Sequence, residues 1–327
     1  MKKLLVIALA LSLLVSPLSS CVADGNNDPE TTGEVTTAEV TETAPEETTD
    51  MAAEETTETE APTTEEATTE AETEPEISFP GAASPKLEAI AKKMATAEEY
   101  VIFTIGDSVT QGQQASDPKT TDYTGRFAVK LAEVFSDKTI FRYDGIANSS
   151  WDSIYFAKRG VRIQNGTNGR INIARCGLGG DTSEKTLNRK DDFINTEING
   201  RTGDLFIICL GINDSWPGKS TVDEYKDNLG LLVDAIQEAH PESDIILMTP
   251  TYVTDNPAKP LVNFANAMKD LADERELPYI DLNAMFNENY AKTEPEDWLS
   301  DNCHPNDVGY NMIANKMISS LFGIEKE

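Results

Sequence analysis

Three residues of the sequence have the types and surroundings that nucleophilic catalysis needs. Ser108 stands in the segment Gly-Asp-Ser directly after a short apolar run, and at such a strand-to-helix turn nearby amides favour developing negative charge. Asp301 precedes His304 by three residues, so its carboxylate can orient the imidazole through Nδ1 and leave Nε2 free as a base. Serine is a poor nucleophile unless a base accepts its proton. Gly-Asp-Ser also forms ordinary turns, so this segment alone does not decide between a turn and a nucleophile.

Two further polar segments follow predicted strands. The glycines of 177–183 allow close backbone approach and an accessible N–H, although a plain loop would look the same. The phosphate-loop pattern, with its Lys-Ser/Thr ending, is absent there. Asn213 lies in 211–214, where its amide can donate a hydrogen bond into a site or cap a helix. His240 ends an amphipathic helix, and we interpret it as structural.

The elements that must position these residues alternate along the chain from about residue 84. Buried-type apolar runs predict strands, and apolar residues at helical spacing predict helices between them. The alternation favours an α/β fold with a parallel sheet and helices on both faces, whose ligands bind beyond the carboxyl ends of the strands. The stretch 141–170 breaks the pattern, and we interpret it as an insertion in which 161–163 pairs with 171–173 as a hairpin. The predicted strands are 100–105, 171–176, 205–210, 245–249 and 279–282, and the predicted helices are 87–97, 126–135, 222–239, 261–277 and one around 310–321.

In order along the chain, Ser108, Gly180, Asn213 and His304 resemble the four marker residues of the SGNH/GDSL hydrolase superfamily. The segments Gly-Asp-Ser, Gly-Asp-Thr-Ser, Gly-x-Asn-Asp and Asp-x-x-His-Pro match its four blocks, and the resemblance covers about residues 98–325. It implies a flavodoxin-like three-layer α/β/α sandwich with a mostly parallel sheet.

The resemblance also implies a role for each marker residue. Ser108 would attack an ester carbonyl, His304 would accept its proton and return it to the leaving alcohol, and Asp301 would hold His304. The backbone N–H groups of Ser108 and Gly180 and the side-chain amide of Asn213 would form the oxyanion hole. No metal or organic cofactor is required by this scheme. One position departs from the family pattern, because the second block often carries Asn where this chain has Arg175.

The N-terminal part of the chain is typical of export and tethering. Lys2 and Lys3 precede the apolar run 4–15, which is too short to span a bilayer, and small residues lead to Cys21. This segment resembles a bacterial lipobox, which implies a signal peptide over 1–20 and a lipidated Cys21; a simple secretory signal is the alternative. We therefore expect an exported bacterial lipoprotein, anchored to the membrane only through Cys21 and displayed at the cell surface or envelope.

The composition separates a tether from a folded domain. The chain has 57 acidic and 27 basic residues and a net charge of −30, which excludes a nucleic-acid binder with a basic surface. Residues 22–78 hold 19 of the acids and no Lys, Arg or aromatic residue, so we expect a disordered acidic Thr/Glu-rich linker over 21–80. The hydrolase domain is predicted over 81–327.

Three cysteines remain in the domain. Cys209 lies in a buried-strand pattern, as a small apolar residue would. Cys176 and Cys303 flank two of the polar segments, and in an exported protein they could form a disulfide. A zinc site from Cys176, Cys303 and His304 is disfavoured, because the usual ligand spacing is absent.

The favoured function is a serine esterase that removes acetyl or other short acyl groups from carbohydrate. Family habit, surface display and the absence of a long apolar lid-like segment motivate that expectation. Its partners would be an acylated carbohydrate or a small ester. A lipase, thioesterase or lysophospholipase acting on longer acyl chains is one alternative, and a non-catalytic surface carbohydrate-binding module is another.

Overall fold

The computed structural model describes residues 77–254 and 260–325. The predicted signal peptide, Cys21 and all but the end of the predicted linker lie outside the described residues. Within the described part of the chain, no helix is long and apolar enough to cross a membrane.

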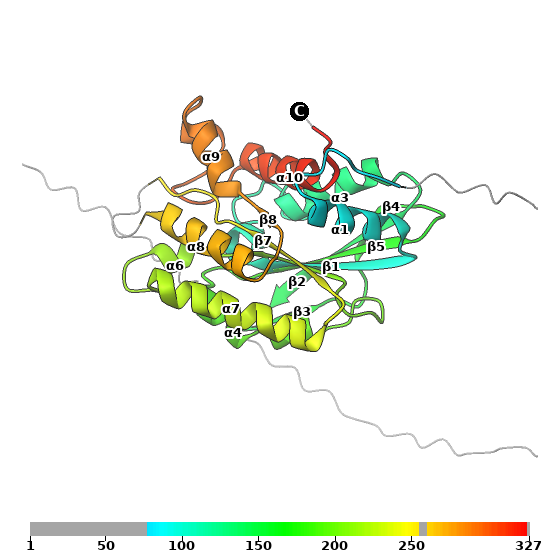
Figure 1. Ribbon diagram of the computed structural model, residues 1–327, viewed down its shortest axis with the longest axis horizontal. Helices are drawn as coiled ribbons and strands as arrows, with labels where there is room; N and C mark the ends of the chain where they lie inside the picture. The colour runs from blue at the N-terminus through cyan, green and yellow to red at the C-terminus, as the bar shows by residue number, and fades with distance from the viewer. Residues whose placement is uncertain (1–76, 255–259, 326–327) are drawn as a thin grey trace, which may run out of the picture. The chain divides into compact units, whose positions relative to one another are not determined.

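A mostly parallel sheet forms the centre of the domain (Figure 1). Its strands lie in the order β3-β2-β5-β1-β6-β7-β8, and β4 pairs with β2. The parallel core β5-β1-β6-β7-β8 has the flavodoxin-like chain order, which reverses at β1 and opens a ligand crevice beyond the strand ends. The strands are β1 Glu99–Gly106, β2 Thr139–Ala147, β3 Ile154–Phe156, β4 Val161–Gln164, β5 Arg170–Gly177, β6 Leu205–Cys209, β7 Asp244–Met248 and β8 Tyr279–Ile280.

Helices cover both faces of the sheet and complete the predicted three-layer sandwich (Figure 1). α1, α3 and α10 pack on one face, and α7 and α8 pack on the other; each face has its own apolar core. The helices are α1 Pro85–Thr96, α2 Ser108–Gln111, α3 Tyr123–Val134, α4 Ser183–Asn188, α5 Asp191–Ile194, α6 Ile212–Ser215, α7 Val222–Ala239, α8 Leu261–Glu274, α9 Leu282–Tyr290 and α10 Asp307–Phe322, with a 3₁₀ turn at Pro295–Asp297.

Local sequence explains where the main helices begin. Thr221 caps α7 with a full capping box, because its hydroxyl accepts from the N–H of Glu224 while the Glu224 carboxylate accepts from the N–H of Thr221. Asn306 caps α10 by accepting from the first turn of that helix. That cap lies two residues after His304, so it fixes the segment that carries the histidine.

The stretch 141–170 differs from the expectation in its pairing. Residues 161–164 pair antiparallel with β2, with Phe141 opposite Arg162, so the predicted hairpin with 171–173 is wrong. The physical reason is that β5 is paired on both edges, by β1 and by β2, and has no free edge for another strand. The inserted strands instead extend the sheet outward from β5.

The start of the described chain packs on the domain. The ring of Phe79 meets those of Phe322 and Phe135 edge-on, at centroid distances of 5.1 and 6.4 Å. A Cβ on Gly81 would lie 2.8 Å from Gly323 Cα, so the two backbones nearly touch. Phe79, which the predicted boundary assigns to the linker, therefore packs as part of the domain.

Candidate active site

Ser108 is the first residue of α2 and follows β1 at once. Gly106 is the last residue of β1. A Cβ at this position would lie 2.4 Å from the Cys209 carbonyl oxygen, so only glycine lets β1 and β6 come this close just before Ser108. Asp107 caps α2, and its carboxylate accepts from Val109 N at 2.9 Å. Burial raises the pKa of Asp107 to about 7. The turn sets Ser108 at the carboxyl edge of the central strand and at the N-terminus of α2.

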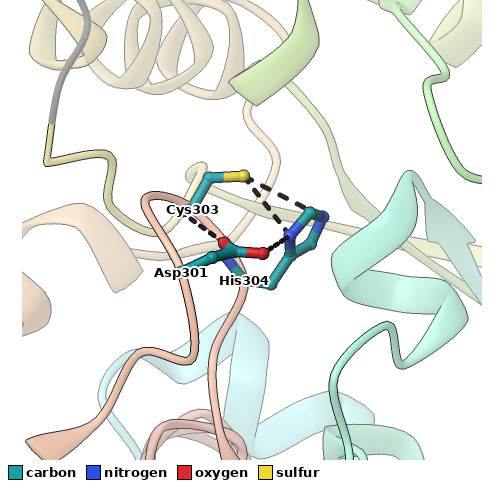
Figure 2. A group of neighbouring side chains, drawn as sticks. All are labelled: Asp301, Cys303 and His304. Atoms are coloured by element: carbon teal, nitrogen blue, oxygen red, sulfur yellow. Dashed lines mark hydrogen bonds and ion pairs between the residues drawn. The ribbon is translucent and has the colours of Figure 1, made fainter. Parts of the chain in front are cut away.

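His304 lies between Ser108 and Asp301. Its Nε2 is 2.9 Å from Ser108 Oγ, and its Nδ1 is 2.7 Å from Asp301 Oδ2. Figure 2 shows the Asp301 carboxylate turned toward the imidazole. The other carboxylate oxygen of Asp301 accepts from the N–H groups of Cys303 and His304, at 2.9 and 2.8 Å. Partial burial alone would raise the pKa of Asp301, but these two N–H groups and the His304 ring hold it below its usual value.

Gly180 and Asn213 lie on the two neighbouring loops. Gly180 has φ of +79°, a left-handed conformation that favours glycine. Asn213 Nδ2 donates one hydrogen bond to the Asp181 carbonyl at 2.8 Å, which leaves its second N–H for another acceptor. Asp214 joins the same two loops, because its buried carboxylate accepts from both the N–H and the hydroxyl of Ser183. The loops after β5 and β6 are thus tied into one unit.

Arg189 holds this unit together through its guanidinium, a role that its place in the sequence does not indicate. Its side chain is buried, with Nε 2.6 Å from Asp181 Oδ2. Its Nη2 donates to the carbonyl of Cys176 at 3.1 Å and to that of Gly106 at 3.4 Å. The guanidinium therefore ties together the carboxyl ends of β1 and β5, which carry Ser108 and the glycine loop.

Arg175 explains the departure from the family pattern in the second block. Its Nη1 lies 2.7 Å from Asp122 Oδ2 and donates to the backbone carbonyls of Gln111 and Pro118. Asp122 is fully buried and is shared with Arg142, whose Nη2 lies 2.6 Å away. Where the family often has Asn, this chain thus has an arginine that anchors the end of α2 to a buried ion-pair cluster.

The cysteines and the second histidine do not form a separate site. Cys176, Cys209 and Cys303 are buried and not in disulfides, so the Cys176–Cys303 bridge that the sequence left open is not formed. Cys176 Sγ instead accepts a hydrogen bond from the Arg189 guanidinium at 3.4 Å. His240 Nε2 lies 2.8 Å from the Ile194 carbonyl, a structural contact at the end of α7.

One group of side chains could hold a metal ion. The ligand atoms of Asp301, Cys303 and His304 lie within 4.8 Å of one another, and Figure 2 shows the Cys303 sulfur beside the imidazole. Cys303 Sγ is 3.5 Å from His304 Nδ1. A cation there would compete with the hydrogen bond between His304 and Asp301, so metal binding and that hydrogen bond exclude each other.

The sequence is similar to known esterase and acylhydrolase sequences. The sequence model of the GDSL-like lipase/acylhydrolase family matches residues 104–312. An acetylxylan esterase of Geobacillus stearothermophilus is 25% identical over 164 residues, which are 46% of this chain and 72% of that protein.

Solved structures share the fold. A two-domain esterase active on acetylated mannans has a TM-score of 0.54 at 18% identity, and the match covers 76% of this chain and 57% of that one. The chain therefore spans little more than half the length of that esterase. An acetyl xylan esterase variant from G. stearothermophilus has a TM-score of 0.50 at 22% identity, and the match covers 70% of this chain and 97% of that one.

Proposed function

Because the chain belongs to the GDSL-like lipase/acylhydrolase family and is a carboxylic ester hydrolase, we propose that it is a serine esterase that removes acetyl groups from carbohydrate. The observation that carries the proposal is the position of His304, with Ser108 Oγ on one ring nitrogen and Asp301 on the other. The acetylxylan esterase among its relatives and the acetyl-mannan esterase among its structural neighbours support the choice of acyl group and substrate class. Because the chain belongs to an ester hydrolase family, we do not propose a non-catalytic binding module.

The proposed reaction follows from these contacts. Ser108 Oγ attacks the ester carbonyl while its proton passes to His304 Nε2. Asp301 keeps the Nδ1 proton in place and favours the imidazolium that forms. The N–H groups of Ser108 and Gly180 and the second N–H of Asn213 stabilise the oxyanion. His304 then protonates the leaving sugar hydroxyl, and water, activated by the same base, hydrolyses the acetyl-enzyme.

Ester hydrolysis by the full chain and by Ser108→Ala tests the proposal. We expect hydrolysis of p-nitrophenyl esters to be fastest with acetate, and acetate to be released from acetylated xylan or acetylated mannan. Ser108→Ala should reduce kcat by more than about ten-thousandfold. A peak at long acyl chains would move the assignment to a lipase, thioesterase or lysophospholipase. Full activity in the variant would refute Ser108 as the nucleophile.

We also propose that the protein is a membrane-anchored lipoprotein, on the strength of its N-terminal sequence. The full chain should partition into the detergent phase with an N-terminal mass that includes acyl groups on Cys21. Cys21→Ser should move it to the aqueous phase. Equal partition of the two proteins would overturn lipid anchoring and leave the esterase proposal untouched.

A further inference from the structure

A row of aromatic rings lies outside the proposed catalytic residues. The Tyr252 ring packs on Tyr290 at a centroid distance of 5.6 Å with a 35° tilt, and edge-on against Trp298 at 5.1 Å. Phe286 also packs on Trp298, at a centroid distance of 5.0 Å. We call Tyr252, Tyr290, Trp298 and Phe286 the aromatic platform. Trp298 is buried, while Tyr290 is 51% exposed, so the row runs from the core to the surface.

The aromatic platform adjoins the segment that carries His304. Tyr252 follows the carboxyl end of β7, and two residues later Thr254 N donates to the Asn302 carbonyl at 2.9 Å. Asn302 lies between Asp301 and His304. Trp298 stands before the same segment, and its neighbour Leu299 forms a β-bridge with Pro305. The platform is therefore attached to both sides of the catalytic loop.

The exposed end of the row is not explained by core packing. Trp298 and Phe286 are buried and serve the core, as aromatic side chains usually do. Tyr290 is the last residue of α9, a helix that projects from the body of the domain (orange in Figure 1). Its ring lies against Tyr252 at the surface, where the contact limits its freedom before any ligand arrives. Such a pre-ordered ring loses little conformational entropy on binding.

The chemistry of the surface matches a neutral sugar ring. A pyranose has an apolar face of C–H groups and a rim of hydroxyls, and tyrosine offers an apolar ring with a polar tip. Residues 79–327 hold 38 acidic and 25 basic residues, an excess of negative charge that disfavours anionic polymers but not neutral ones. Ligand sites commonly combine aromatic walls with a few polar groups in this way.

We propose that the aromatic platform binds a sugar ring of a neutral acetylated polysaccharide and so presents a neighbouring acetyl ester to Ser108. The inference rests on the proposed function, because it assigns the platform to the same substrate. Small aryl esters have no second sugar ring, so their hydrolysis does not depend on the platform.

The test compares polymeric and small substrates in Tyr290→Ala. Loss of one stacking contact should raise KM for acetylated xylan or acetylated mannan, and lower kcat/KM, roughly two- to tenfold. Hydrolysis of p-nitrophenyl acetate should stay unchanged. Tyr290→Phe should retain the polymer activity, since the ring remains, and Tyr290→Leu should show the same reduction as Tyr290→Ala.

Tyr155→Ala is the matched control. Tyr155 is 58% exposed on β3, at the opposite edge of the sheet from β8 and α9. Its loss should change neither substrate. An equal loss of polymer activity in Tyr155→Ala and Tyr290→Ala would overturn the proposal, as would an unchanged polymer activity in Tyr290→Ala.

A binding measurement separates this proposal from the catalytic one. The Ser108→Ala chain should be retarded in affinity electrophoresis through deacetylated xylan or mannan, and adding Tyr290→Ala should reduce the retardation. Retardation without any ester hydrolysis by the parent chain would reject the esterase and keep the platform. Ester hydrolysis without retardation that depends on Tyr290 would reject the platform and keep the esterase.

Discussion

Replacing Asn213 by alanine should separate a catalytic donor from a structural one. One N–H of its amide is already used by the Asp181 carbonyl at 2.8 Å, so only the second can meet the oxyanion. Loss of an oxyanion donor costs about 100- to 1,000-fold in rate, or about 3–4 kcal/mol. Loss of the single bond to Asp181 should cost only about 1 kcal/mol of folding free energy. The rate should therefore fall much more than the stability.

Steady-state hydrolysis of p-nitrophenyl acetate and urea unfolding measure the two effects. The loss should fall on kcat rather than KM, because the oxyanion exists only in the transition state. Asn213→Asp, which keeps the shape but cannot donate, should be at least as slow. Asn228→Ala is the control, since that amide donates to Ser183 Oγ at 3.3 Å and is given no part in the reaction. A kcat for Asn213→Ala within tenfold of the parent would refute the donor role and leave Asn213 as a loop tie.

Three further predictions concern the same site. Asp301→Asn should turn an amide N–H toward His304 Nδ1, fix the wrong tautomer and lower kcat on the order of ten-thousandfold; a kcat near the parent value would contradict the orienting role. Burial raises the pKa of Asp107 from its ordinary 3.8 to about 7, so the folded state binds this proton more tightly and stability falls as the pH rises between those values. Between pH 4 and pH 8 the unfolding free energy of the parent should therefore fall by up to roughly 4 kcal/mol more than that of Asp107→Asn. Urea unfolding at the two pH values measures both, and an equal fall in the two proteins would count against this. Zn²⁺ should inhibit the enzyme reversibly, and Cys303→Ser should need at least about tenfold more Zn²⁺ for the same inhibition. Cys209→Ser should be inhibited like the parent. Equal inhibition curves for all three proteins would rule out the Cys303 thiolate as a ligand.

The fold was predictable because its strong signals are local. β6 is a continuous apolar run, which is typical of a buried parallel strand, and the structure buries every residue of it. Three of the four polar motifs follow such a run and the fourth precedes α10, so the topology gathers the first three at one edge of the sheet. Asp301 and His304 are close in sequence, and their contact needs only a short loop.

The missed features depend on residues that only the folded chain brings together. Arg189 bonds to Gly106, which is 83 residues away in sequence, and a backbone carbonyl leaves no trace in the residue types. The error with 161–163 has the same origin, because nearness in sequence favoured β5 while the free edge belonged to β2. The sequence left the Cys176–Cys303 disulfide open, because flanking positions do not give the Cα separation that a bridge requires.

The packing of Phe79 and Gly81 on the end of α10 determines where a force from the N-terminal side of the chain enters the domain. α10 begins three residues after His304 and ends at Phe322, so its 16 residues span about 24 Å between the catalytic loop and the point where the chain enters the domain. A force applied to the chain before Phe79 therefore acts on the C-terminal end of α10 and not on the loop that carries His304. If the proposed lipid anchor holds the chain at that point, the catalytic loop lies at the end of α10 away from the anchor.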